Sequence, residues 1–276
     1  MNDQLPAIAA FRALHESGCF VLPNPWDAGS AEYLRHLGFK ALATTSAGFA
    51  FTQGLPDSVA AVPRDMMLEH IRAVVEATPL PVNADFQTGY ADEPEGVAAN
   101  VTLCIATGVA GLSIEDATGD SARPLYEFDL ALERIRAARA AIDASGIPVV
   151  LTARCEAWLV GDPDPLRVSL ERLAAFAEAG ADCLYAPGVS KPDEIVAIVK
   201  AVAPRPVNVL VSSPSPDHTV NRLSELGVRR ISVGSALARV AWGAFISAAR
   251  SIAETGTFEC FAGAASFAEL NGLFQR

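Results

Sequence analysis

Residues 148–187, PVVLTARCEAWLVGDPDPLRVSLERLAAFAEAGADCLYAP, contain one complete strand–helix–strand unit. A β-branched run occupies 148–154, an amphipathic pattern typical of a helix covers 165–179, and a second apolar run begins at 183. Gly180 stands between the helix and the second strand, where a left-handed cap is favoured because glycine has no side-chain penalty. Two strands joined in this way are predicted to be parallel, with a right-handed crossover.

The same alternation runs along the whole chain, and eight such apolar runs can be counted. The expected strands are Phe20–Pro23, Ala41–Thr45, Pro81–Asp85, Gly111–Glu115, Pro148–Arg154, Cys183–Pro187, Val207–Val211 and Arg230–Gly234. The expected helices between and after them are Ala28–Leu37, Asp65–Ala77, Glu95–Thr107, Tyr126–Ala144, Pro165–Ala179, Pro192–Val202, Asp217–Leu226 and Ser235–Ile252. Eight parallel strands close a (β/α)8 TIM barrel, which is the predicted fold.

An open, doubly wound sheet is the structural alternative. Its first turn would normally carry a GxGxxG motif, whereas residues 24–30 here read NPWDAGS. We therefore expect residues 1–276 to form a single α/β barrel domain, with an N-terminal helix within 1–18 and a C-terminal extension at 253–276. The extension is rich in phenylalanine, so it is expected either to cap the barrel or to contact another subunit.

The composition excludes several classes of protein. Apolar residues make up 51% and charged residues 19% of the chain, as in folded globular proteins. The net charge of -11 disfavours a nucleic-acid partner, which would need a basic surface. No signal peptide or membrane span is expected. The five scattered cysteines suit reduced thiols, so a cytoplasmic location is predicted.

The active site of such a barrel lies at the carboxyl ends of its strands. The residues expected there are Asn24, Trp26, Asp27, Thr44, Thr45, Ser46, Gly48, Asp85, Gln87, Glu115, Asp116, Arg154, Glu156, Pro187, Gly188, Ser212, Ser213, Gly234 and Ser235. Asp85 and Glu115 end adjacent strands and would repel one another unless a cation lies between them. The alternative is that both are solvated loop acids.

Oxygen ligands favour a hard cation, Mg2+ or Mn2+, over zinc. His15, His36 and His70 fall on helical stretches, and only His218 lies near the carboxyl end of a strand. Lysine chemistry is also disfavoured, because of Lys40, Lys191 and Lys200 only Lys191 lies on the active-site side.

Arg154 closes a strongly apolar strand and is predicted to bind a substrate carboxylate or a developing enolate oxygen. A purely structural pairing with Glu156 or Glu115 is the alternative. The Thr-Thr-Ser-Ala-Gly run at 44–48 offers hydroxyls and closely spaced amides, as an anion-binding turn would.

Six segments together resemble the isocitrate lyase and phosphoenolpyruvate mutase superfamily over nearly all of the predicted barrel. They are LPNPWDAGSAEYLRHLGFKALATTSAGFA at 22–50, GLPD at 54–57, VNADFQTGY at 82–90, GLSIED at 111–116, LTARCEA at 151–157 and RRISVG at 229–234. The resemblance implies a Mg2+ ion chelated by a pyruvate-like unit of the substrate. It also implies an oligomer, a dimer or tetramer, whose subunits exchange the C-terminal helix.

The resemblance assigns roles to individual positions. Asp85 would be the direct metal ligand, with Glu115 and Asp57 acting directly or through water. The substrate carboxylate would lie against Ser46, Ala47 and Gly48, beside Thr45, with Trp26 as a wall and Arg154 as the anion contact. Arg154, Asp57 and Glu115 are the expected catalytic residues, and Asp85, Gln87 and Glu115 the expected metal site.

Two departures narrow the predicted activity. Gln87 replaces the second carboxylate of the family's third-strand motif, and its amide can only hold a metal-bound water. The loop DATGDSARPLYEF at 116–128 lacks the cysteine, lysine and histidine of the lyases, which argues against a true isocitrate or methylisocitrate lyase.

The sequence therefore favours a Mg2+-dependent lyase or decarboxylase that cleaves a carbon–carbon bond of a small 2-oxo (di)carboxylic acid through an enolate-like intermediate. Carbon–phosphorus chemistry of the phosphonopyruvate or phosphoenolpyruvate type is the first alternative. A barrel that binds a 2-oxo acid with little or no turnover is the second.

Overall fold

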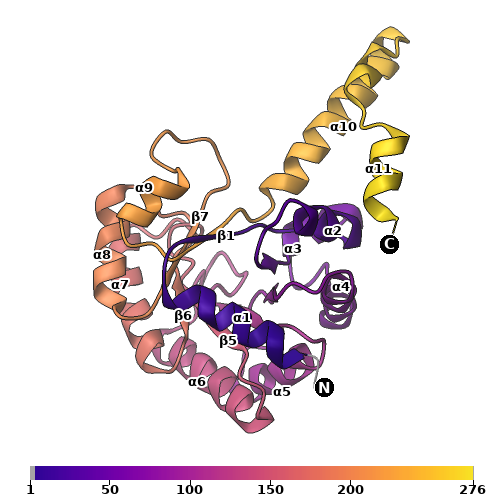
Figure 1. Ribbon diagram of the computed structural model, residues 1–276. Coiled ribbons are helices and arrows are strands. Elements are labelled where there is room, and N and C mark those ends of the chain that lie inside the picture. The colour runs from indigo at the N-terminus through magenta and orange to yellow at the C-terminus, as the bar shows by residue number, and fades with distance from the viewer. Residues whose placement is uncertain (1–3, 276) are drawn as a thin grey trace.

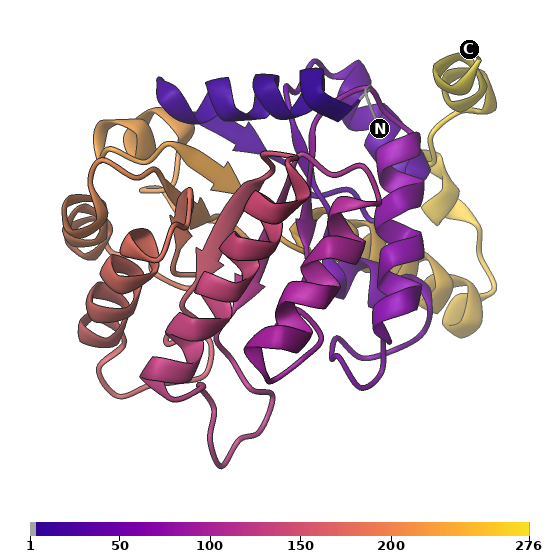
Figure 2. The same cartoon turned by 90° about the horizontal axis from the view of Figure 1, so that it is seen from below.

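The computed structural model describes residues 4–275, and it confirms the predicted (β/α)8 barrel (Figures 1 and 2). Its eight strands are parallel and follow the order β1-β8-β7-β6-β5-β4-β3-β2. The strands are β1 (Phe20–Leu22), β2 (Leu42–Ala43), β3 (Val82–Asp85), β4 (Gly111–Glu115), β5 (Val150–Arg154), β6 (Cys183–Tyr185), β7 (Val207–Leu210) and β8 (Arg230–Ser232). Each lies within one of the expected runs.

The helices surround this sheet, and most of them begin and end within a few residues of their predicted bounds. They are α1 (Gln4–Glu16), α2 (Ala28–His36), α3 (Ser46–Thr52), α4 (Arg64–Glu76), α5 (Pro94–Ile105), α6 (Phe128–Ser145), α7 (Pro165–Glu178), α8 (Pro192–Val202), α9 (Val220–Glu225), α10 (Ala236–Thr255) and α11 (Phe267–Phe274), with a 3-10 turn at Glu259–Gly263. The sequence did not predict α3. The run at 44–48 is not an open turn, because the side chain of Thr45 caps this short helix.

The strands turn polar side chains inward and apolar side chains outward. On β4, Leu112 and Ile114 are buried in the core between sheet and helices. Ser113 and Glu115 instead line a cavity inside the barrel. The same alternation places Asn83, Asn208 and other polar residues of the neighbouring strands in that cavity. The main apolar core is therefore the layer outside the strands, and the centre of the barrel is polar.

The N-terminal helix α1 packs against the amino-terminal ends of the barrel strands. Phe11 is fully buried, and the ring of His15 lies edge-on to it with centroids 4.7 Å apart. His15 Nδ1 lies 2.7 Å from Phe11 O, and its Nε2 lies 3.2 Å from NH1 of Arg230 on β8. Arg230 donates further to Asn208 at 2.9 Å and to Thr152 at 3.0 Å, and it is buried.

A side chain joins the two edges of the sheet. No ladder joins β1 to β2 among the seven strand pairs of the described chain, where one backbone hydrogen bond connects Ala43 N to Pro23 O at 3.0 Å. The amide of Asn24 then donates to Thr44 O at 2.8 Å, while its oxygen accepts from Val233 N and Gly234 N. Asn24 thus connects the ends of β1, β2 and β8.

The last long helix leaves the barrel. Figure 1 shows α10 projecting away from the sheet, with α11 returning beside α2. Of the residues in α10 only Ala238 is buried. The tail at 253–275 has no buried residue and its helix α11 contacts α2, so of the two alternatives left open the contact with another subunit stays a prediction. The large exposed apolar residues of α10 and of the tail that follows it are Val240, Trp242, Phe245, Ile246, Phe258, Phe261, Phe267, Leu270 and Phe274. None of the described helices is both long and apolar enough to cross a membrane.

Candidate active site

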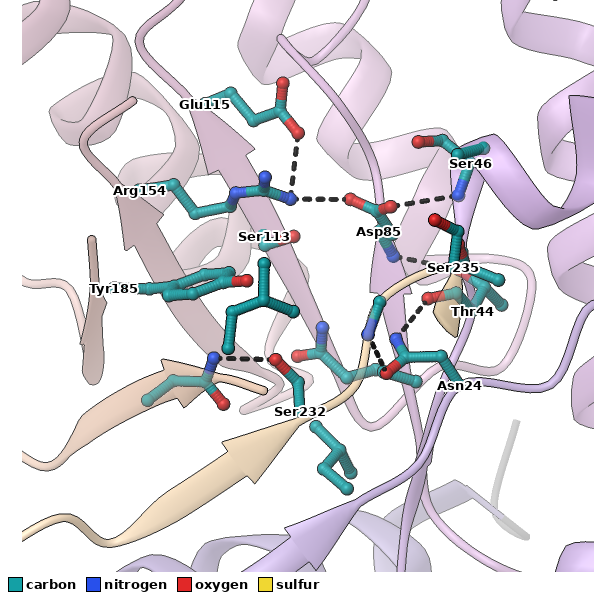
Figure 3. Close-up of a pocket in the computed structure, with 18 of the residues that line it drawn as sticks. Asn24, Thr44, Ser46, Asp85, Ser113, Glu115, Arg154, Tyr185, Ser232 and Ser235 are labelled. Carbon is teal, nitrogen blue, oxygen red and sulfur yellow. Dashed lines mark hydrogen bonds and ion pairs between the residues drawn. The ribbon is translucent and has the colours of Figure 1, made fainter. Parts of the chain in front are cut away.

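A cavity of about 150 Å³ lies inside the barrel and reaches its carboxyl-terminal mouth (Figure 3). Most of the residues that the sequence predicted for the site line it: Thr45, Ser46, Ala47, Asp57, Asp85, Glu115 and Arg154. Asn24, Tyr185, Ser232 and Ser235 line it as well. No histidine, lysine or cysteine of the described residues is among the lining. His218 instead contacts Ser190 O at 2.9 Å, and Lys191 pairs with Glu194.

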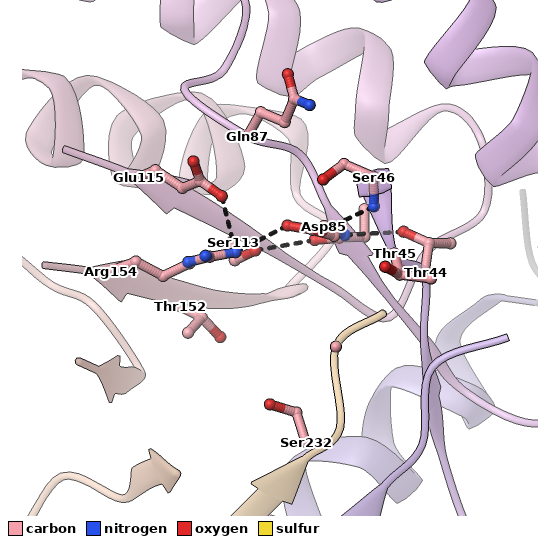
Figure 4. Close-up of polar contacts among 12 residues, drawn as sticks. Thr44, Thr45, Ser46, Asp85, Gln87, Ser113, Glu115, Thr152, Arg154 and Ser232 are labelled. Carbon is pink, nitrogen blue, oxygen red and sulfur yellow. Dashed lines mark hydrogen bonds and ion pairs between the residues drawn. The ribbon is translucent and has the colours of Figure 1, made fainter. Parts of the chain in front are cut away.

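One guanidinium lies among three carboxylates at the mouth of the cavity. NH1 of Arg154 is 2.9 Å from Asp85 Oδ1 and 2.8 Å from Glu115 Oε1 (Figures 3 and 4). Its Nε is 2.8 Å from Glu156 Oε1. The cation between Asp85 and Glu115 is therefore the Arg154 side chain itself, so the pairing with Glu115 and Glu156 that the sequence left open is present.

Burial and charge crowding shift the protonation of this cluster. Burial raises the pKa of Glu115 well above its usual range; Arg154 opposes the shift, while Glu156 and Asp85 add to it. Burial alone would lower the pKa of Arg154, but Glu115, Glu156 and Asp85 more than offset it and raise the pKa. Burial, followed by the charge of Asp85, also raises the pKa of Asp57. The mouth therefore carries an excess of negative charge that an additional cation would relieve.

The amides of the predicted carboxylate cradle are partly used within the protein. Ser46 N donates to Asp85 Oδ2 at 2.9 Å, and Gly48 N donates to the Thr45 hydroxyl at 3.2 Å. Asp85 N in turn donates to Thr44 Oγ1 at 2.9 Å. This fixes the orientation of the Asp85 carboxylate, as Figure 4 shows, between the Arg154 guanidinium and the start of α3.

Trp26 and Gly48 lie behind the cavity wall and are not part of it. A Cβ on Gly48 would lie 2.5 Å from Thr45 Cγ2, 3.1 Å from Trp26 Cβ and 3.3 Å from Ala238 Cβ. Glycine is therefore needed here for close packing between α3, Trp26 and the first turn of α10. The structure places both residues in the support of the site, where they do not touch the cavity.

The contacts of Gln87 and Asp57 bear on whether the site can hold a metal ion. Gln87 Nε2 donates to Asp57 Oδ1 at 3.0 Å, whereas Gln87 Oε1 is buried and has no hydrogen-bond partner among residues 4–275. An unpaired buried acceptor calls for a donor such as a metal-bound water. The described residues contain no group of three or more His, Cys, Asp or Glu side chains placed to hold a metal. The unpaired Gln87 oxygen beside Asp57 is the observation that fits an ion such as Mg2+, which keeps waters and substrate oxygens around one or two carboxylates.

Sequence reasoning missed Tyr185 as a member of the site. Arg154 Cζ lies 4.9 Å from the centre of the Tyr185 ring, which Figure 3 shows beneath the guanidinium. Burial raises the pKa of Tyr185 to about 12, so its hydroxyl stays protonated near neutrality. The residue falls two positions before the expected end of its strand, and the inward alternation of β6 could have revealed it.

Comparisons with known proteins show the family and agree with the fold. A solved structure from Burkholderia cenocepacia J2315 is 46% identical, with a TM-score of 0.95 over 100% of this chain and 98% of that chain. An oxaloacetate decarboxylase of Rhodopseudomonas palustris (strain HaA2) is 32% identical over 218 residues, 75% of this chain and 71% of the relative. The structure of oxaloacetate acetylhydrolase with its product oxalate is 29% identical, with a TM-score of 0.85 over 98% of this chain and 94% of that chain. The family model for phosphoenolpyruvate phosphomutase matches residues 11–253, so the chain belongs to the phosphoenolpyruvate phosphomutase family, within the superfamily that its motifs resemble.

Proposed function

We propose that this protein is a Mg2+-dependent enzyme that cleaves a carbon–carbon bond of a 2-oxo dicarboxylic acid such as oxaloacetate, by decarboxylation. The observation that carries the proposal is the small cavity in which Arg154 is the cation at the mouth and to which the described residues contribute no histidine, lysine or cysteine. Decarboxylation fits such a site, because it needs a stabilised enolate and no protein base. The relatives that act on oxaloacetate support the choice of substrate.

Each residue has a proposed role in this reaction. Asp85 would hold Mg2+ or Mn2+, with Glu115, Asp57 and Gln87 around it, and the ion would supply Lewis-acid stabilisation of negative charge on substrate oxygens. Ser46, Ala47 and Thr45 border the place of the substrate carboxylate. Arg154 binds the oxygen on which charge develops, since a preorganised cation stabilises the transition state more than the ground state.

The chemical step balances without a protein acid or base. The bond between the third carbon and its carboxylate breaks, carbon dioxide leaves, and the electron pair forms the enolate of pyruvate. A solvent proton then reaches the third carbon. The cavity, about 150 Å³ in volume, is small, as a site for a four-carbon acid would be, and it opens to solvent, which can deliver this proton.

A substrate screen tests the proposal. Pyruvate and carbon dioxide should form from oxaloacetate with Mg2+ and should not form with EDTA; Arg139→Lys, on the outer helix α6, serves as the control variant and Arg154→Lys as the impaired one. Turnover of phosphonopyruvate in place of oxaloacetate would favour carbon–phosphorus chemistry instead, which the family match keeps as the alternative. Binding of both acids without turnover would favour the binding-only alternative.

We also propose that the protein is a homo-oligomer, a dimer or tetramer, in which α10 and α11 pack on a neighbouring subunit. Phe245 is 61% exposed and Phe267 is 88% exposed, and such side chains on a projecting helix are rarely left in water. Closed symmetry would follow from reciprocal exchange of this segment. A reducing cytoplasm is the proposed compartment, since all five cysteines are free.

A further inference from the structure

Two side chains bind five consecutive backbone carbonyls in the loop between β3 and α5. Arg134 of α6 donates through NH2 to Thr88 O and through NH1 to Ala91 O, and through NH1 to Asp92 O at 2.7 Å. Asn100 of α5 donates to Gly89 O at 2.8 Å and to Tyr90 O at 3.1 Å. The carbonyl of Gln87, which precedes them, accepts from Glu115 N at 2.9 Å. The whole path of the loop is thereby specified by groups outside it.

Arg134 is itself held firmly and is directed at this loop. It is among the largest fully buried side chains, at 1% exposure, and it forms no ion pair within the described residues. Its guanidinium lies 3.9 Å from the centre of the Tyr126 ring, and the Tyr126 hydroxyl donates to Asp92 Oδ1 at 2.5 Å. A buried charge without a direct ion pair is normally costly, so its hydrogen bonds to the loop carbonyls, together with Tyr126 and the nearby charges of Asp92 and Asp116, stabilise it.

The loop is strained at two residues, of which Gln87 is hydrogen-bonded to Asp57 of the cavity lining. Gln87 has φ 47° and Tyr90 has φ 57°, values in the left-handed region that side chains other than glycine rarely adopt. Each also leaves one polar atom buried without a partner, Gln87 Oε1 and the Tyr90 hydroxyl.

Strain of this kind persists where the surroundings over-determine it, and it clusters at functional sites. A loop that only connected β3 to α5 could relax and pair both polar atoms. We propose that Arg134, assisted by Asn100, is a positioning residue that holds Gln87 in its left-handed conformation, so that its amide stays on Asp57, which lines the cavity, and its Oε1 remains available to a metal-bound water. The proposal deepens the proposed function and rests on it.

The test measures binding rather than turnover. Calorimetry gives the dissociation constant of Mg2+ in the presence of oxalate, a planar dianion with adjacent oxygens like those of a 2-oxo acid. The variants are Arg134→Lys, which keeps the charge, Arg134→Gln, which loses it, and Asn100→Ala, which removes two of the five hydrogen bonds. Arg139→Lys is the matched control, because Arg139 lies on the same helix and pairs with Asp143 and Asp182.

Groups that orient metal ligands from outside typically change affinity by about 10–100-fold. Arg134→Gln should therefore weaken Mg2+ binding by about 10-fold or more, Arg134→Lys by less, and the control by no more than about twofold. Amide hydrogen exchange at 87–92 should rise in the same order, with the rest of α5 and α6 unchanged.

Three outcomes would overturn the proposal. Faster exchange of the loop with unchanged Mg2+ and oxalate affinity would mean that the clamp serves stability alone, while the proposed function would stand. If Arg134→Gln fails to fold, unchanged affinity in Asn100→Ala and Arg134→Lys has the same meaning. A wild-type protein that binds neither Mg2+ nor oxalate would remove the proposed function together with this inference.

Discussion

Arg154 NH1 lies 2.9 Å from Asp85 Oδ1, so two residues that are 69 positions apart share one interaction across the intervening strand β4. The other oxygen of Asp85 accepts from Ser46 N, and the same NH1 is 2.8 Å from Glu115. A substrate carboxylate or a metal ion that approaches Asp85 must therefore compete with, or rearrange, this ion pair. Substitutions at Arg154 and Gln87 would alter the charge balance of this cluster.

Arg154→Lys should retain the fold and lose most activity. Lysine keeps the positive charge but loses the planar fork that joins Asp85, Glu115 and Glu156. Loss of one preorganised donor typically lowers turnover by about 10²–10³-fold. Steady-state kinetics with oxaloacetate, together with thermal unfolding, measure both effects. Turnover near that of the wild type would show that Arg154 only neutralises its neighbours.

Gln87→Glu or Gln87→Asp should tighten Mg2+ binding, whereas Asp85→Ala should abolish it. A carboxylate at 87 would replace the unpaired Oε1 with an anionic acceptor for metal-bound water. It would also face Asp57, which now accepts from the Gln87 amide, so the metal-free protein should become less stable. Calorimetry and unfolding with and without Mg2+ give both quantities. No tightening in either acidic variant would mean that Gln87 does not face the ion.

The pH dependence of stability should contain a contribution from His15. Burial, and then Arg230, lowers the pKa of His15 from its usual 6.5 to about 3. Between these values the unfolded chain binds a proton that the folded protein does not, so stability falls as pH decreases from 6.5 towards 3. From pH 7 to pH 5 this linkage amounts to about 2 kcal/mol of unfolding free energy.

His15→Gln should lose that part of the pH dependence, although it is less stable at pH 7. His36→Gln, on the exposed surface of α2, is the control variant. Urea unfolding at several pH values measures the slope. An unaltered slope in His15→Gln would show that His15 is protonated together with Arg230, against the geometry described.

Deletion of Phe258–Arg276 should lower the fraction of protein that is oligomeric. The double substitution Phe245→Asp and Val240→Asp on α10 should lower this fraction further. These apolar side chains are exposed at 61% and 71%, and a charge there would disfavour burial against a second subunit. Light scattering gives the mass of each protein. A monomeric mass for the wild type, unchanged on deletion, would exclude the exchanged helix.

Most of the fold could be predicted from the sequence because the alternation of apolar strand-like runs and amphipathic helical stretches is local and repeated. The run Gly111–Glu115 matches β4 residue for residue, and Pro192–Val202 matches α8. The helix α3 escaped prediction, since its seven residues are too few to show a clear period and the Thr45 cap resembles a turn. The hydrophobic pattern did not fix the direction of α10, because an amphipathic helix packs equally well on its own barrel or on another; only the family resemblance implied a helix exchanged between subunits.

The candidate site was predictable at the ends of strands and less so behind them. Asp85, Glu115 and Arg154 open on one cavity, as their positions at the strand ends indicated. Their mutual ion pairs depend on rotamers that no spacing reveals. Tyr185 and Arg134 reach the region from inside a strand and from an outer helix, and only the packed structure brings them near it.

The hydrogen bonds of Asn24 stand where a strand ladder is missing, so the number of hydrogen bonds between neighbouring strands differs around the barrel. Seven neighbouring strand pairs are joined by ladders, whereas β1 and β2 depend chiefly on one asparagine amide and one backbone hydrogen bond. Fluctuations in the width of the barrel should therefore concentrate on that side, where few hydrogen bonds resist them. Ser46 and Ala47 lie just beyond it, while Glu115 and Arg154 lie on fully paired strands. A ligand of slightly different width would thus be accommodated by movement of Ser46 and Ala47. Glu115 and Arg154, on the opposite side of the cavity, would keep their positions.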